Sequence, residues 1–336
     1  MRMQITEKTA LQEIYGCSLL EAAREYLIGN GAELFRTKGS ATLLDINHEQ
    51  PTWYAGDMAF GLNRLLEISE NEKTYIHSVY TPEEMEKEPD KKDVCLFHFP
   101  GNKGDSYVIL MAGGGYGCVC SMAEAFPVAA KLNEMGITAF CLNYRTGQPG
   151  LLPKPMEDLS AAWRYIEANS ELFHVNPGHY AVGGFSAGGH AAAMWGMKEL
   201  GYRNYHLPRP QLLMLAYPFI SSVNAGQKEC EILFTVMCGG DYTPETLERY
   251  FIDRHIDTEY PPVYIVHSQD DSTVPIENAE SMAAALHTAG VVCKSEFPPT
   301  GGHGFGLGTN SAAAGWVERA VQFWQRNQTK TEVINK

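Results

Sequence analysis

Residues 180–193, YAVGGFSAGGHAAA, place a single serine, Ser186, between two pairs of glycines. The residues before Ser186 form an apolar run that is typical of a buried strand, and the small residues after it are compatible with a helix. Glycine two residues away on each side of a serine, at a turn from strand to helix, matches the G-x-S-x-G pattern of a strained nucleophile. Small residues also surround purely structural turns, so this interpretation depends on what the rest of the chain supplies.

Short apolar runs alternate with segments of helical periodicity from about residue 94 onward. The predicted strands cover residues 94–99, 107–112, 138–144, 180–185, 211–217, 263–268 and 292–297. The predicted helices cover about 122–135, 157–173, 187–199, 276–289 and 311–327. A period that switches between 2 and 3.6 in this way predicts an α/β fold, with a mostly parallel central sheet and helices on both faces.

The first part of the chain does not follow this alternation. We predict that residues 1–90 form an N-terminal extension and connection, with amphipathic helices at about 18–28 and 59–69 and the aromatic stretch PTWYAGDM between them. The stretch TPEEMEKEPDKK at 81–92 is charged and bounded by proline, which predicts a solvated connection. The extension is expected to pack on the core or to form a homodimer contact rather than to contribute chemistry.

The composition argues against several kinds of partner. The 336 residues carry a formal net charge of −14 and a pI near 5.2, so neither nucleic acid nor a membrane surface is expected as a partner. The N-terminus lacks the apolar stretch of a signal peptide, and no run approaches the roughly 18 apolar residues of a membrane span, which predicts a cytoplasmic protein. The eight cysteines lack metal-site spacing. We therefore expect reduced thiols, no metal site and no cofactor.

A serine hydroxyl is a weak nucleophile, so acyl transfer requires an imidazole to take its proton and a carboxylate to orient that imidazole. The stretch VYIVHSQDDSTVP places Asp270 and Asp271 after a late predicted strand, and FPPTGGHGFG places His303 in a glycine-rich loop after the last one. The order Ser, Asp, His along the chain is the order of an α/β-hydrolase. Either aspartate could fill the role on this argument alone.

Backbone N–H groups for a developing oxyanion are expected where VILMAGGGYG ends a predicted strand. We predict an oxyanion hole formed by the N–H groups of Gly114, Gly115 and Ala187, the residue after the serine. The glycine run does not match the dinucleotide pattern G-x-G-x-x-G, because Cys118 stands at the position of the last glycine.

Other residues near these motifs have simpler interpretations. His190 follows Ser186 by one helical turn, and we expect it to pack rather than to act as the base. Cys118 and Cys120 have no elbow around them, so we expect structural thiols rather than a cysteine nucleophile. Tyr116 could either line an acyl pocket or pack beneath the glycine loop.

Four stretches together resemble a known family: AGGGYGCVCSMAEAFPVAAKLNEMGITAFCLNYR, LPKPMEDLSAAWRYIEANSELFHVNPGHYAVGGFSAGGHAAA, PPVYIVHSQDDSTVPIENA and FPPTGGHGFGLG. They are similar to the α/β-hydrolases of the carbohydrate-esterase group, which includes acetyl xylan esterase-like and feruloyl esterase-like serine esterases. The resemblance implies Ser186 as nucleophile, Asp271 as the acid of a D-x-x-V-P motif and His303 as base. Ala112 stands where the family often has proline or histidine before the glycines.

The resemblance covers about residues 94–327 and implies an α/β-hydrolase catalytic domain at 91–330, with an insertion at about 223–260 that could partly roof the site. It implies a serine esterase for short-chain acyl esters, with an acetylated sugar or oligosaccharide as substrate. A serine peptidase, an arylesterase or a feruloyl esterase would use the same triad. A catalytically inactive binding protein on the same fold is the alternative that is not an enzyme.

Overall fold

The computed structural model describes residues 3–27, 38–72, 74–102, 104–221 and 228–334. Its centre is an eight-stranded sheet with the strand order β1-β2-β4-β3-β5-β6-β7-β8. The strands are β1 (Ile76–Ser78), β2 (Cys95–Phe99), β3 (Asp105–Met111), β4 (Thr138–Asn143), β5 (Val175–Phe185), β6 (Leu212–Ala216), β7 (Val263–Val266) and β8 (Cys293–Glu296). β2 runs antiparallel to β1 and β4, and all the other pairs are parallel.

Burial accounts for the apolar runs in the sequence. Every residue of β2, β4, β6 and β7 is buried, as expected for strands that are covered by helices on both faces. Each of the seven predicted strands corresponds to one strand from β2 to β8, which confirms the α/β-hydrolase architecture. The edge strand β1 was not predicted, because only three residues form it.

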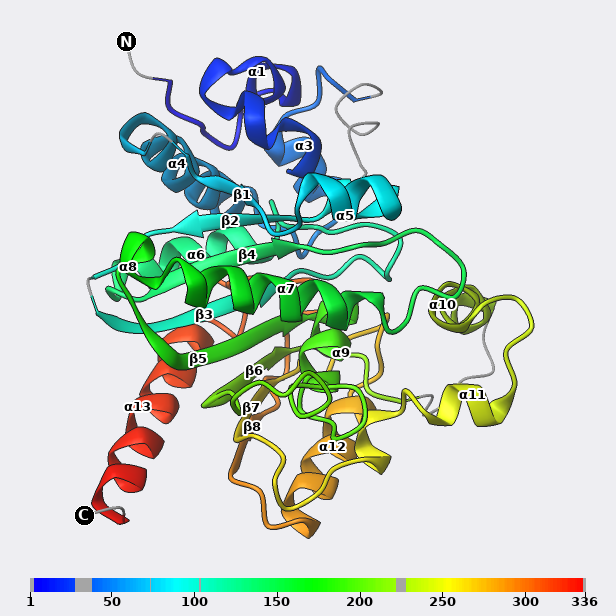
Figure 1. Cartoon of the computed structure of the whole chain (residues 1–336). Helices are drawn as coiled ribbons and strands as arrows, with labels where there is room; N and C mark the ends of the chain where they lie inside the picture. The colour runs from blue at the N-terminus through cyan, green and yellow to red at the C-terminus, as the bar shows by residue number, and fades with distance from the viewer. Residues whose placement is uncertain (1–2, 28–37, 73, 103, 222–227, 335–336) are drawn as a thin grey trace.

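The helices between the strands cover the sheet (Figure 1). They are α6 (Ala125–Glu134), α7 (Lys154–Ala168), α8 (Ser170–Phe173), α9 (Ser186–Met194), α12 (Glu277–Thr288) and α13 (Trp316–Ile334). α6 contacts α13 whereas α7 contacts α9, in line with one helical layer on each face. The helix predicted at about 157–173 is divided into α7 and α8, because the side-chain amide of Asn169 donates to the carbonyl of Tyr165 and ends α7.

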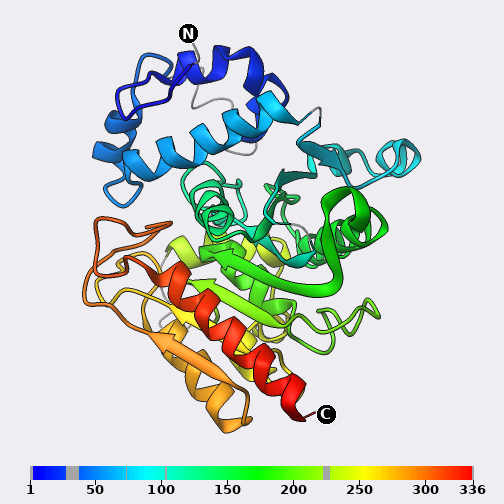
Figure 2. The same cartoon turned by 90° about the vertical axis from the view of Figure 1, so that its left-hand side faces the viewer.

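The N-terminal helices lie together at one end of the molecule (Figures 1 and 2). They are α1 (Leu11–Gly16), the 3₁₀-helix η1 (Ser18–Tyr26), α3 (Leu43–Glu49) and α4 (Ala55–Asn71). α4 packs on α6, and Leu62 and Leu65 of α4 are fully buried. The extension therefore packs on the core as expected. The homodimer contact stays a prediction.

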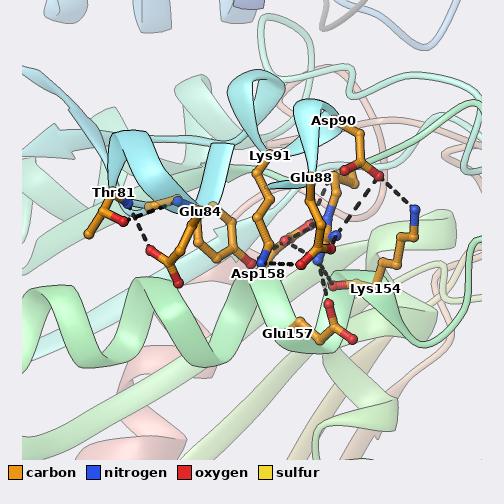
Figure 3. A network of polar contacts seen from close by, with 10 residues as sticks. Thr81, Glu84, Glu88, Asp90, Lys91, Lys154, Glu157 and Asp158 are labelled. Carbon is orange, nitrogen blue, oxygen red and sulfur yellow. Dashed lines mark hydrogen bonds and ion pairs between the residues drawn. The ribbon is translucent and has the colours of Figure 1, made fainter. Parts of the chain in front are cut away.

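The charged stretch at 81–92 is more ordered than a solvated connection. It forms α5 (Pro82–Lys87) and the 3₁₀-helix η2 (Pro89–Asp93), and Figure 3 shows its side chains meeting those of α7. The cause is Arg145, whose side chain is only 1% exposed and lies 2.8 Å from Asp158 and 2.7 Å from Glu157. Arg145 also lies 3.3 Å from Glu88 in this stretch. A buried guanidinium needs several carboxylates around it, so this mostly exposed connection is anchored to the domain through Glu88.

The predicted insertion contains α10 (Lys228–Cys238), α11 (Pro244–Glu248) and the 3₁₀-helix η3 (Ile252–Arg254). Its first residues, 223–227, lie outside the described residues. The backbone N–H of Leu152 donates to the carbonyl of Met237 at 3.0 Å, and Met237 is fully buried, so α10 is packed against the domain. Among the described helices, none combines the length and the apolar character that crossing a membrane requires.

Candidate active site

Ser186 lies at the sharp turn where β5 ends and α9 begins. Its φ is +52°, a left-handed conformation that L-residues rarely adopt and that costs free energy to maintain. A Cβ on Gly184 would lie 2.2 Å from the carbonyl oxygen of Gly188, and a Cβ on Gly188 would lie 2.2 Å from that of Met111. Both glycines of the G-x-S-x-G pattern are therefore required by close backbone approach. This packing also brings the end of β3 next to the serine.

The structure brings the three predicted side chains into one hydrogen-bonded line. The Ser186 hydroxyl lies 2.8 Å from Nε2 of His303, and Nδ1 of His303 lies 2.7 Å from Oδ2 of Asp271. The three residues follow β5, β7 and β8, so each lies at the carboxyl end of a parallel strand. This geometry allows a neutral imidazole to accept the hydroxyl proton while the carboxylate stabilises the charge that develops on the ring.

The carboxylate of Asp271 is held by four donors. Oδ1 accepts the backbone N–H groups of Thr273 and Val274, both at 2.9 Å. Oδ2 faces Nδ1 of His303 and also Nε2 of the fully buried His267, at 3.1 Å. Burial alone would raise the pKa of Asp271, but the hydrogen bonds from His267 and His303 outweigh it and hold the pKa well below its usual range. The carboxyl group is therefore ionised at neutral pH.

Asp270 takes a different part in the same loop. Its Oδ1 accepts the backbone N–H of Gly302 at 2.8 Å. It thus links the loop after β7 to the loop of His303. Of the two aspartates that the sequence left open, the structure places Asp271 against the imidazole.

The glycine loop after β3 lies directly beside the serine. A Cβ on Gly113 would come within 2.7 Å of the Cβ of Ser186. Gly114 and Gly115 have φ values of +132° and +60°, which favour glycine at both positions. Ala187 is the second residue of α9, where a backbone N–H has no partner inside the helix. The three predicted oxyanion donors are therefore backbone groups around Ser186, at a loop and a helix N-terminus.

His190 and Tyr116 fix this loop from behind. Tyr116 is fully buried, and its hydroxyl donates to Nδ1 of His190 at 2.7 Å, while Nε2 of His190 donates to the carbonyl of Tyr250 at 2.7 Å. Burial lowers the pKa of His190 to about 4, so its ring is neutral at pH 7. The packing role expected for His190 agrees with these contacts. Tyr116 packs beneath the loop, which decides between its two interpretations.

Cys118 and Cys120 lie just beyond the same loop. Their sulfur atoms are 3.7 Å apart, and Cys120 is buried while Cys118 is half-buried. Among the described residues, neither thiol is hydrogen-bonded to an imidazole, unlike Ser186 with His303. Within the described ranges, no group of three or more His, Cys, Asp or Glu side chains is arranged to hold a metal ion.

Residues of the N-terminal extension contact the loop of His303, which the sequence alone did not indicate. The hydroxyl of Thr52 donates to the carbonyl of His303, and a Cβ on Gly304 would lie 3.0 Å from the indole nitrogen of Trp53. The buried Asp57 accepts the Thr309 hydroxyl at 2.6 Å. Figure 2 shows the loop after β8 beside the turn that precedes α4. The aromatic stretch PTWYAGDM was the only signal, and nothing in it indicated which loop it would meet.

The sequence analysis also missed Glu124 and Tyr217. The carboxyl group of Glu124, 3% exposed, accepts the backbone N–H of Gly113 and the hydroxyl of Tyr217. Neither residue belongs to a recognisable motif.

Comparison with known proteins agrees with this fold. Residues 97–205 match the model of the BD-FAE family. An acetylxylan esterase of Xylanibacter ruminicola is 27% identical over 66% of this chain and 45% of its own length. An endo-1,4-beta-xylanase B of Butyrivibrio fibrisolvens is 27% identical over 62% of this chain and 34% of its own length. The chain thus spans less than half the length of these two curated relatives.

Among solved structures, an acetyl ester-xyloside bifunctional hydrolase of Caldicellulosiruptor lactoaceticus is 28% identical, with a TM-score of 0.58. The similarity covers 71% of this chain and 88% of that one. These similarities agree with the α/β-hydrolase fold, and the chain is similar to carboxylic ester hydrolases of carbohydrate-esterase type. Within it, residues 97–205 resemble the BD-FAE family.

Proposed function

We propose that the chain is a serine esterase that hydrolyses short-chain acyl esters, and that it deacetylates an acetylated sugar or oligosaccharide. The observation that carries the proposal is the line of hydrogen bonds from Ser186 through His303 to Asp271, with Ser186 at φ +52°. A strained serine in contact with an imidazole that is itself held by a carboxylate is the arrangement that nucleophilic acyl transfer needs.

In the first half-reaction, Oγ of Ser186 attacks the ester carbonyl while Nε2 of His303 takes the hydroxyl proton. Asp271 stabilises the imidazolium and keeps Nδ1 protonated, so that Nε2 is free to accept. The N–H groups of Gly114, Gly115 and Ala187 are assigned to the developing oxyanion. The imidazolium then gives its proton to the leaving alcohol, and an acyl-serine remains.

In the second half-reaction, the same groups act on water. His303 takes a proton from a water molecule as that water attacks the acyl-serine carbonyl. The tetrahedral intermediate collapses, the proton returns to Oγ of Ser186, and the carboxylic acid leaves. Apart from the ester and the water molecule, every reacting group in these two steps is a side chain or backbone N–H group of the chain.

The substrate class rests on the relatives. An acetylxylan esterase and an acetyl ester-xyloside bifunctional hydrolase are among the similar proteins, and each name refers both to an acetyl ester and to a xylose-based carbohydrate.

The test is a panel of p-nitrophenyl acetate, butyrate and octanoate with acetylated xylo-oligosaccharides, methyl ferulate and aminoacyl anilides, applied to wild type and to Ser186→Ala. We expect kcat/KM to be highest for acetyl esters, and Ser186→Ala to abolish turnover with the fold intact by circular dichroism. Preference for octanoate would contradict the short-acyl assignment. Preferential cleavage of anilides would favour a peptidase, and wild-type protein inert toward the whole panel would favour a binding protein.

A further inference from the structure

One buried carboxyl group connects the two loops on either side of the nucleophile. Glu124 immediately precedes α6, and its Oε2 accepts the backbone N–H of Gly113 in the loop after β3. Its Oε1 accepts the hydroxyl of Tyr217 at 3.1 Å, and that hydroxyl accepts the backbone N–H of Gly306 at 3.1 Å. Gly306 is three residues after His303. A single side chain therefore joins the oxyanion loop to the loop of the imidazole.

On the oxyanion side, the hydrogen bond from Gly113 to Glu124 leaves the backbone of Gly113 little conformational freedom. A Cβ on Gly113 would lie 2.7 Å from the Cβ of Ser186 and 3.1 Å from Oε2 of Glu124, so this glycine is enclosed between the two side chains. Its N–H points to Glu124, which fixes the orientation of the chain entering Gly114 and Gly115. Oxyanion donors are effective only when they are oriented before the charge develops, so a fixed entry into the loop favours catalysis.

On the imidazole side, Tyr217 carries the contact. Its ring lies edge-on to the His303 ring, with centroids 5.1 Å apart, and it is fully buried. Its φ is +40°, an unfavourable conformation for a tyrosine. The backbone N–H of Tyr217 donates to the carbonyl of Val266 at 2.7 Å, so β7 helps to hold this conformation. Such strain persists where several contacts determine the position of one side chain.

The charge of Glu124 also faces the reacting groups. Burial raises its pKa to about 7, although the Gly113 N–H, the attraction of a charged His303 and the Tyr217 hydroxyl oppose this rise. The other titratable groups that face it are the thiols of Cys118 and Cys120 and the phenol of Tyr144. None of these groups can become a cation, so among them and His303 only the imidazolium form of His303 would carry a positive charge.

We propose that Glu124 is a positioning residue, whose carboxyl group holds the oxyanion loop and, through Tyr217, the His303 loop in a single reactive arrangement. The inference rests on the proposed hydrolase function. Among the described residues, Glu124 is hydrogen-bonded to Gly113 and Tyr217 and not to the hydroxyl of Ser186, so it is distinct from the triad.

The variant Glu124→Gln tests this role because an amide cannot replace both contacts. If its oxygen accepts the Gly113 N–H, its NH₂ group faces Tyr217, and the phenol hydrogen loses its acceptor. If the amide is reversed, two N–H donors oppose each other at Gly113. We expect kcat for p-nitrophenyl acetate to fall about 10- to 100-fold, less than the full loss of an oxyanion donor, with KM changed less than about threefold.

A pH profile separates positioning from simple packing. A negative charge near the imidazole favours its protonated form. Because the pKa of Glu124 is about 7, this charge is present mainly on the upper part of the acid limb of kcat/KM, so Glu124→Gln should move that upper part to lower pH. Tyr217→Phe keeps Glu124 and its bond to Gly113, and we expect it to lower kcat less than Glu124→Gln does. The matched control is Glu134→Gln at the exposed end of the same helix, whose partner is Lys131, and it should leave kcat unchanged.

The labelling rate of Ser186 by a fluorophosphonate serves as the second readout, since it needs the nucleophile, the base and the oxyanion loop but no particular substrate. Slower labelling in Glu124→Gln than in Glu134→Gln supports the proposal even if the natural ester has not been found. Rates and acid limb equal to wild type in both Glu124→Gln and Tyr217→Phe would overturn it. If the wild type is not labelled at all, the proposed function fails, whereas a labelled wild type with unaffected variants refutes only the positioning role.

Discussion

Replacing Asp271 by asparagine should disable the site more than its small change in shape suggests. The carboxylate accepts from two backbone N–H groups at Oδ1, those of Thr273 and Val274, and from the rings of His303 and His267 at Oδ2. An asparagine has one oxygen and one NH₂ group. Whichever way the amide is turned, its NH₂ faces two donors that formerly bonded to oxygen.

The magnitude follows from these four contacts. If the amide oxygen faces His303 and His267, the N–H groups of Thr273 and Val274 lose their acceptor, and each unsatisfied buried donor costs about 1–3 kcal/mol. If the oxygen faces the backbone, Nε2 of His267 keeps the carbonyl of Val274, 2.9 Å away, and Nδ1 of His303 can accept from the NH₂ group. The second orientation is therefore favoured, and losing the hydrogen bonds to a charged carboxylate should lower the free energy of unfolding by about 1–3 kcal/mol. The effect on rate is separate. If the asparagine oxygen faces the backbone, its NH₂ group favours the tautomer of His303 with the proton on Nε2, which cannot accept from Ser186. We expect kcat to fall about 10⁴-fold.

The matched control is Asp270→Asn in the same loop. Asp270 uses one oxygen, for the N–H of Gly302, and an asparagine oxygen can take the same hydrogen bond. We expect kcat to change by less than about threefold and unfolding by less than about 1 kcal/mol. The assay is p-nitrophenyl acetate hydrolysis with urea unfolding on the three proteins. A ratio of Asp270→Asn to Asp271→Asn activity below 10, or the reverse ranking, would refute the reasoning.

Three further outcomes follow from contacts outside the triad. Asp158→Ala leaves the buried Arg145 without its innermost partner and should lower the free energy of unfolding in urea by about 3–5 kcal/mol. The side chain of Glu157 is 46% exposed, so Glu157→Gln should lower it by less than about 1 kcal/mol. Equal effects of the two substitutions would contradict this account. Hydrogen bonds hold the pKa of Asp271 below its usual range, so its contribution to stability is complete above about pH 4 and is lost as the pH falls further. The free energies of unfolding of wild type and Asp271→Asn should therefore converge at low pH. A difference between them that widens on acidification would be inconsistent with this reasoning. Thr52→Val removes the hydroxyl that donates to the His303 carbonyl, and in steady-state kinetics it should lower kcat about 3- to 10-fold with less effect on KM. An unchanged kcat would mean that the extension does not position His303.

The sequence predicted those features that local patterns determine. The order of strands and helices follows from short apolar runs, and these appear as β2 to β8. The serine elbow is also local, since Gly184, Ser186 and Gly188 lie within five residues and each meets a steric requirement of the turn. Asp271 and His303 could be named because each sits in a loop after a predicted strand. Their distances in the structure agree with the predicted triad, whose catalytic roles remain a proposal.

Long-range partners could not be predicted in the same way. Thr52 bonds to a residue 251 positions later, and Glu124 reaches Tyr217 across 93 positions. A carboxylate at the start of a helix is ordinarily solvated, and nothing in AEAFPVAA indicates that this one is buried. The anchoring of the charged stretch at 81–92 could not be predicted for the same reason, because Arg145 lies more than 50 residues further along the chain.

The boundaries of the similarity have a chemical consequence. The BD-FAE match at 97–205 includes the glycine loop, Glu124 and Ser186, but His303 and Asp271 lie beyond it. The proposed nucleophile and the proposed oxyanion donors therefore lie within the matched segment, whereas the proposed base and acid lie outside it. The same base is contacted by Thr52 from the N-terminal extension, which also lies outside the match. In the proposed mechanism His303 delivers its proton to the leaving alcohol, so the hydrogen bond from Thr52 to the His303 carbonyl connects the extension to the loop of the proposed base.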